Sequence, residues 1–112
     1  MIIKEKTVNG LPILCLNGKL DIFSKNTFRE TVEKYQETGG KGLILDFEGI
    51  TFVDSIGLGA LTLVAKTFQK VKGRVILVNP QEKVKSMFVE MNVGEIVPMY
   101  KTDESYSQFS AI

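Results

Sequence analysis

The sequence predicts a single α/β domain with a mixed, mostly parallel β-sheet, and three observations support this prediction. Apolar runs typical of strands alternate with segments of helical periodicity along most of the chain. An Asn9-Gly10 pair near the start is a strong hairpin turn signal between two strand-like runs. The chain has 112 residues, a usual size for one domain with its own core. We therefore expect residues 1–112 to form one domain.

The first two strands are expected at residues 2–8 and 11–17, as antiparallel neighbours across the Asn9-Gly10 turn. Residues 18–23 read as a loop, and Ser24 can cap the helix that follows.

A first amphipathic helix is expected over residues 25–38, because apolar residues recur at i, i+4 and i+7: Phe28, Val32 and Tyr35. Gly39-Gly40 is a typical helix end. Residues 43–47 form a short apolar strand of the kind that is buried on both faces of a sheet. Phe52-Val53 reads as a further extended piece.

A second helix is expected to present one apolar face, with Leu58, Leu61, Ala65, Phe68 and Val71, and to end at Lys72-Gly73. Residues 74–78 are the next strand. Asn79, Pro80 and Glu82 together predict the start of a third helix, with Asn79 as the N-cap and Glu82 completing a capping box.

The buried face of this third helix is expected to contain Val84, Met87, Phe88 and Met91, and Asn92 is expected in a left-handed conformation after it. A fifth strand over residues 95–99 and a short helix from Thr102, carrying Tyr106 and Phe109, complete the chain. The prediction is thus five strands and about four helices, with right-handed crossovers between the parallel strands.

The composition excludes several classes of protein. The chain has no histidine, so it contains no Ser-His-Asp triad, Cys-His pair or His-ligated zinc site. Its formal net charge is +1, which argues against direct nucleic-acid binding. No apolar run approaches the roughly 20 residues of a membrane span, and no signal peptide precedes the first strand. The lone Cys15 fits a buried site in a reducing interior, so we expect a cytoplasmic protein.

The stretch TFVDSIGLG at residues 51–59 joins a strand to the second helix and contains Ser55. Ser55 can be an N-cap, worth about 1 kcal/mol, and Asp54 competes for that role. A hydrolase elbow is disfavoured because its first glycine and an activating histidine are both missing. A phosphate-binding loop is disfavoured because the Walker lysine is missing.

Two further interpretations remain for this junction. A carboxylate cluster could form from Asp21, Asp46 and Asp54 at strand ends, although solvated or loop-capping aspartates are the commoner outcome. A binding switch at Ser55 accounts better for the two glycines, Gly57 and Gly59. Gly57 and Gly59 each cost up to about 1 kcal/mol in a helix, and that cost is understandable if another surface must come close to the backbone beside Ser55.

The stretch Asp54-Ser55-Ile56-Gly57-Leu58-Gly59 resembles the signature of STAS domains, and more narrowly that of bacterial anti-sigma-factor antagonists. Gly18-Lys19-Leu20-Asp21 is similar to a second family element, G-x-[LI]-D, and the order of elements matches the family fold across essentially the whole chain. The sequence departs from the family pattern at Ile56, where a hydroxyl or a small residue is common, and at Lys19, where glutamate is common.

The resemblance implies a binding switch rather than an enzyme. The unphosphorylated protein binds an anti-sigma factor that is also a serine kinase, which frees the sigma factor. Phosphorylation of Ser55 ends the binding, and a phosphatase removes the phosphate. The implied recognition residues are Asp21, Asp54, Ile56, Gly57 and Gly59, with Ile22 and Phe23 as weaker candidates. No metal or cofactor is implied. The alternative is a STAS-type ligand-binding or scaffold module in which Ser55 is only a cap.

Overall fold

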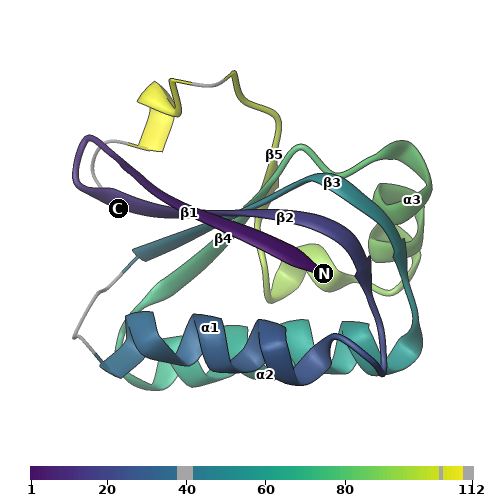
Figure 1. The fold of residues 1–112 in the computed structure, drawn as a ribbon. Coiled ribbons are helices and arrows are strands. Elements are labelled where there is room, and N and C mark those ends of the chain that lie inside the picture. The colour runs from purple at the N-terminus through teal and green to yellow at the C-terminus, as the bar shows by residue number, and fades with distance from the viewer. Residues whose placement is uncertain (38–41, 104, 110–112) are drawn as a thin grey trace.

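The computed structural model describes residues 1–37, 42–103 and 105–109, and within these ranges five strands form one sheet in the order β1-β2-β3-β4-β5 (Figure 1). β1 pairs antiparallel with β2, and the other neighbours are parallel. The elements are β1 (Ile2–Val8), β2 (Leu11–Leu20), α1 (Lys25–Glu37), β3 (Gly42–Val53), α2 (Ser55–Lys70), β4 (Arg74–Val78), α3 (Glu82–Glu90), η1 (Val93–Glu95), β5 (Met99–Tyr100) and η2 (Ser107–Phe109).

The first hairpin is confirmed. Asn9 and Gly10 both have positive φ, 53° and 79°, as expected for a tight two-residue turn that matches the twist of its strands. Val8 then faces Leu11, and Ile2 faces Asn17. The parallel arrangement of β2, β3 and β4 is confirmed as well.

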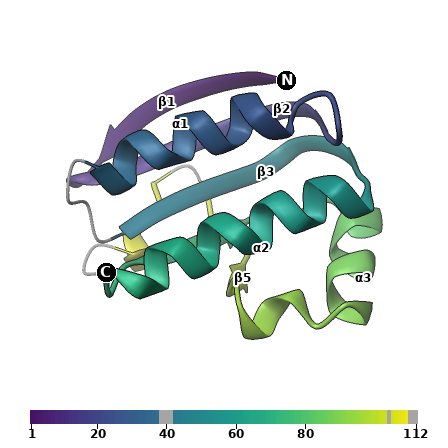
Figure 2. The ribbon, with the colours of Figure 1, turned by 90° about the horizontal axis from the view of Figure 1, so that it is seen from below.

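The two faces of the sheet are covered differently. α1 and α2 run side by side across one face (Figure 2), and the larger part of the core lies beneath them. The C-terminal segment covers the other face, where Tyr106 and Phe109 pack on a smaller cluster that includes Ile13, Ile44 and Ile76. These isoleucines are register partners on β2, β3 and β4, so they form one apolar row across the sheet.

Two strands are longer than predicted. β2 continues to Leu20, so residues 18–20 belong to the sheet rather than to a loop. β3 is a single strand that includes Phe52 and Val53. The extra length comes from pairing, because Lys19 faces Phe52 and Leu20 faces Val53 at the ends of the two strands. Local sequence could not show this pairing.

α1 begins one residue after Ser24, as predicted, but Ser24 acts on the preceding chain. Its hydroxyl donates to the Lys19 carbonyl (2.6 Å) and accepts from the Asp21 N–H (3.1 Å). Phe28 and Val32 are buried, and Tyr35 packs against the core. Thr38 and the predicted stop at Gly39-Gly40 lie outside the described residues.

The core faces of α2 and α3 agree with the prediction except at their last residues. Leu58, Leu61, Ala65 and Phe68 are buried, but Val71 is exposed because α2 ends at Lys70. Val84 and Phe88 are buried and Met87 is partly buried, but Met91 is exposed because α3 ends at Glu90. Asn92 is left-handed, with φ 56°, as predicted.

The predicted capping box of α3 is wrong. α3 begins at Glu82 with Gln81 in the N-cap position, and Asn79 lies upstream with φ 55°. The Asn79 side chain instead accepts a hydrogen bond from the Thr102 N–H (2.9 Å), which ties the start of the C-terminal segment to the end of β4. A long-range bond therefore replaces the local cap.

The C-terminal predictions also need correction. Residues 93–97 fold into a 3-10 turn and its continuation, since the Ile96 and Val97 N–H groups both donate to the Val93 carbonyl, and β5 is limited to Met99–Tyr100. The predicted fourth helix is only the 3-10 turn η2, because Tyr106 takes a positive φ of 49° and interrupts helical geometry. Three α-helices are thus present in the described residues. None of the described helices is long and apolar enough to span a membrane.

Candidate functional site

Ser55 is an exposed residue at the start of α2. Asp54 is the N-cap, and its Oδ1 accepts from the Gly57 N–H at 2.7 Å. Ser55 is therefore the first helical residue rather than the cap. Its hydroxyl makes no hydrogen bond within the described ranges. Of the two competing caps, the aspartate holds the helix and leaves the serine available.

The β2–α1 loop lies beside this helix start because β2 and β3 are parallel neighbours that end together at Leu20 and Val53. Asp54 links the two segments: its Oδ2 accepts from the Ile22 N–H at 3.3 Å, and its own N–H donates to the Leu20 carbonyl at 3.3 Å. The loop and the start of α2 thus form one edge of the molecule.

The two glycines of the motif have different surroundings. Gly57 is buried, and a Cβ added there would lie 2.0 Å from the Leu20 carbonyl oxygen. Contact inside the molecule thus already requires a glycine at position 57. Gly59 is exposed, and an added Cβ would meet no atom within 4 Å. The idea that a glycine exposes backbone to an approaching surface therefore fits Gly59 rather than Gly57.

The β2–α1 loop, the end of β3 and the start of α2 carry four exposed apolar side chains. They are Ile22, Phe23, Phe52 and Ile56, which we call the apolar rim. Phe23 is 91% exposed, an unusual position for a phenylalanine that is held in a well-bonded loop. The Lys19 ammonium lies 6.0 Å from the centroid of the Phe52 ring, at the margin of a cation–π contact. Grouped apolar exposure of this kind is typical of a protein interaction surface.

The predicted site residues come together at this edge, since Asp21, Ile22 and Phe23 lie in the β2–α1 loop and Asp54, Ser55, Ile56, Gly57 and Gly59 at the start of α2. The sequence interpretation did not consider Phe52 as a candidate; it is an exposed aromatic residue at the end of β3. The end of β3 does not follow strict alternation, since Thr51 and Phe52 are both exposed between buried Ile50 and Val53, so no simple pattern marked Phe52.

Asp46 does not join Asp21 and Asp54, so the carboxylate cluster does not form. Asp46 is buried on the other face of the sheet, where it accepts from the Tyr106 hydroxyl (2.8 Å) and the Glu48 N–H (2.9 Å). No group of three or more potential metal ligands occurs in the described part of the chain.

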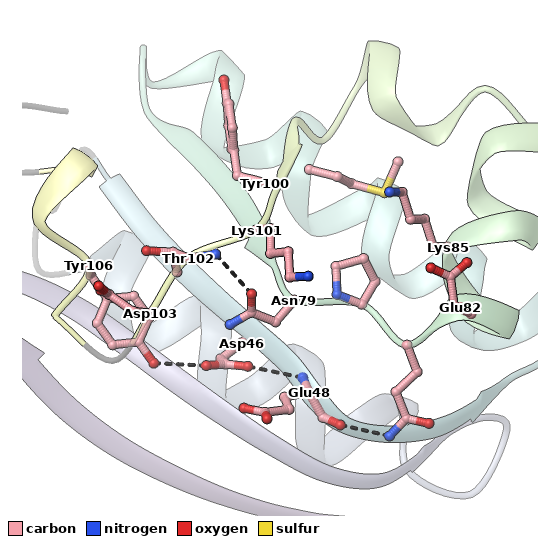
Figure 3. A pocket seen from close by; sticks show the side chains of 13 residues that line it. Asp46, Glu48, Asn79, Glu82, Lys85, Tyr100, Lys101, Thr102, Asp103 and Tyr106 are labelled. Atoms are coloured by element: carbon pink, nitrogen blue, oxygen red, sulfur yellow. Dashed lines mark hydrogen bonds between the residues drawn. The ribbon is translucent and has the colours of Figure 1, made fainter.

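A cavity of about 590 Å³ lies next to Asp46, between β3, the start of α3 and the C-terminal segment (Figure 3). Hydrogen bonds between its lining residues hold its walls. The Gln81 amide donates to the Glu48 carbonyl (2.7 Å), and Asn79 accepts from Thr102. Acidic and basic side chains both line it, so the cavity has no single charge preference: its lining includes Glu82, Asp103, Lys85 and Lys101.

We expect Tyr106→Phe to lower the free energy of unfolding by about 2 kcal/mol, because it removes the hydroxyl that donates to the buried Asp46 carboxylate. Burial and the bond to Asp46 raise the pKa of Tyr106 above its ordinary value of 10.0. The stability that this group supplies is therefore complete below pH 10 and is lost as the pH rises further. Urea unfolding of both proteins at pH 7 and pH 10.5 tests this. If wild type and Tyr106→Phe lose the same amount of stability between pH 7 and pH 10.5, the prediction is contradicted.

Comparisons with known proteins agree with this fold. The sequence profile of the STAS domain matches residues 3–105. BtrV of Bordetella bronchiseptica, a candidate anti-sigma factor antagonist, is 24% identical over 98 residues, which cover 88% of this chain and 84% of BtrV.

Two solved structures have the same fold. A candidate anti-sigma factor antagonist from Thermotoga maritima superposes with a TM-score of 0.85 at 26% identity, over 95% of this chain and 92% of that one. The unphosphorylated anti-sigma factor antagonist SpoIIAA of Bacillus gives a TM-score of 0.79 at 24% identity, over 96% and 93% of the two chains. The profile match spans almost the whole sequence, and the chain belongs to the STAS domain family.

Proposed function

We propose that this protein is an anti-sigma factor antagonist. Its unphosphorylated form binds an anti-sigma factor that is also a serine kinase, and phosphorylation of Ser55 ends this binding. The observation that carries the proposal is the Ser55 hydroxyl, which is exposed, makes no hydrogen bond in the described structure and adjoins Ile56 of the apolar rim. The distant similarity to anti-sigma factor antagonists supports the choice of partner.

The location of Ser55 suits a switch that acts on binding rather than on folding. A phosphate carries about −1.5 to −2 charges at neutral pH. At a helix N-terminus that charge is favourable by about 0.3–1 kcal/mol, and repulsion from Asp54 offsets part of the gain. The same charge costs several kcal/mol when it is buried without a partner under another protein. The domain therefore stays folded while the complex dissociates.

The proposal assigns the remaining roles to other proteins. The ATP belongs to the kinase, and a separate phosphatase removes the Ser55 phosphate. The antagonist is a ligand and a substrate, not an enzyme, and it contacts no nucleic acid directly, in keeping with its net charge of +1. These proposed partners imply that the protein acts in the cytoplasm.

Intact mass after incubation with the candidate anti-sigma kinase and Mg-ATP tests this function. We expect wild type to gain about 80 Da, the mass of one phosphate, and Ser55→Ala to gain none. Ser86→Ala, which changes an exposed serine on α3, is the matched control and should gain the phosphate. The proposal is wrong if wild type gains no mass while the kinase modifies a known substrate, or if Ser55→Ala is still modified.

A further inference from the structure

We propose that Asp54 acts as a positioning residue that fixes the β2–α1 loop against the start of α2. By this account Asp54 does not itself contact the partner. Its carboxylate holds the loop that carries Phe23 against the helix start that carries Ser55, so that two segments of the chain form one recognition surface. The recognition role rests on the proposed function, whereas the tie between the two segments can be measured on the isolated protein.

The loop from Asp21 to Ser24 is braced mainly by its own side chains. The Asp21 N–H donates to the Ser24 hydroxyl (3.1 Å), and the Phe23 and Ser24 N–H groups donate to Asp21 Oδ1 (3.0 and 3.1 Å). The Ile22 N–H is the exception among these described residues, because its acceptor is Asp54, 32 residues later in the chain. Among the hydrogen bonds of the described residues, the bond from Ile22 to Asp54 is thus the one that joins residues 21–24 to the start of α2.

Asp54 uses its two carboxylate oxygens for two different segments at once. Oδ1 accepts from the Gly57 N–H inside α2 at 2.7 Å, and Oδ2 accepts from the Ile22 N–H in the loop at 3.3 Å. If one of these two oxygens is replaced by a group that cannot accept, the donor that faces it loses its acceptor. The bond to Ile22 is the longer one and is exposed, so it is the bond that such a replacement is expected to remove.

The hydrogen bond from Ile22 to Asp54 matters because the β2–α1 loop carries two side chains of the apolar rim. Phe23 is almost fully exposed and Ile22 about half exposed, and both belong to the apolar rim. A recognition surface binds well only when its side chains are held close to their bound positions. If the bond to Ile22 is lost, the braced loop can move as a unit, and Phe23 moves relative to Ile56 and Ser55.

The substitution Asp54→Asn separates the two bonds. Asparagine caps helices about as well as aspartate, but its amide nitrogen donates and cannot accept from the Ile22 N–H. We expect an unchanged melting temperature, a protected Gly57 amide and an Ile22 amide that exchanges about tenfold faster. Affinity for the anti-sigma factor should fall about tenfold. Glu90→Gln removes the same charge from an exposed site on α3 and should change none of these quantities.

Phe23→Ala distinguishes positioning from direct contact. If Asp54 acts through the loop, Asp54→Asn should cost little further affinity in a Phe23→Ala background. Equal losses in both backgrounds would overturn the positioning role, and an Ile22 amide that exchanges at the wild-type rate would overturn the tie itself. If wild type fails to bind the anti-sigma factor, the proposed function and the recognition role both fall, but the exchange rates still decide whether the tie exists.

Discussion

Ser55→Glu should weaken binding to the anti-sigma factor by between about 30-fold and several thousand-fold, the equivalent of about 2–5 kcal/mol. The reason is the location of Ser55 directly before the exposed Ile56, so that a partner that covers Ile56 and the first turn of α2 would also bury the new carboxylate. The fold should survive, because an acidic side chain is acceptable in the first turn of a helix. Titration calorimetry with the purified partner measures the loss.

Two controls belong with this prediction. Ser86→Glu places the same charge on an exposed part of α3, away from the rim, and should bind like wild type. Ser55→Ala should bind at least as well as wild type, because it adds neither charge nor bulk. A Ser55→Glu protein that is fully folded and binds with wild-type affinity would show that Ser55 lies outside the interface.

Gly57→Ala and Gly59→Ala are expected to change stability in opposite directions. At position 57 the new methyl group would lie 2.0 Å from the Leu20 carbonyl oxygen, which is backbone and cannot rotate away. We expect overpacking to lower the free energy of unfolding by about 3 kcal/mol. At position 59 the methyl group meets no atom within 4 Å, and the better helix propensity of alanine should add up to about 1 kcal/mol.

Denaturant unfolding of the two variants measures this difference, and each serves as the control for the other. A stabilised Gly57→Ala protein would mean that α2 does not pack against the end of β2 as described. Binding adds a second readout for Gly59→Ala: if the partner approaches the first turns of α2, this variant should be more stable than wild type and yet bind more weakly.

The elements that the sequence predicts well are those set by local patterns. The Asn9-Gly10 turn needs only two residues with positive φ, and the faces of α1 and α2 follow from apolar spacing. The errors occur where a distant partner decides. Leu20 belongs to β2 because it pairs with Val53, and Asn79 forgoes its cap because its side chain binds the Thr102 backbone.

The candidate site follows the same rule. The motif at residues 54–59 is contiguous, so the sequence could indicate Ser55 and the residues around it. It could not show that Asp54 accepts from Ile22, because no local pattern connects positions 32 residues apart. It also could not separate Gly57 from Gly59, because the carbonyl that crowds Gly57 belongs to Leu20 on another strand.

The parallel pairing of β2 with β3 has a consequence for chains that are not yet folded. The loop that carries Phe23 and the helix start that carries Ser55 come together when Leu20 pairs with Val53, so a nascent or partly unfolded chain carries both segments without the surface that they form together. A chain that is damaged or still leaving the ribosome should then fail to sequester the anti-sigma factor. Under the proposed function, binding of the anti-sigma factor would thereby require the folded domain and not merely the presence of the two sequence segments.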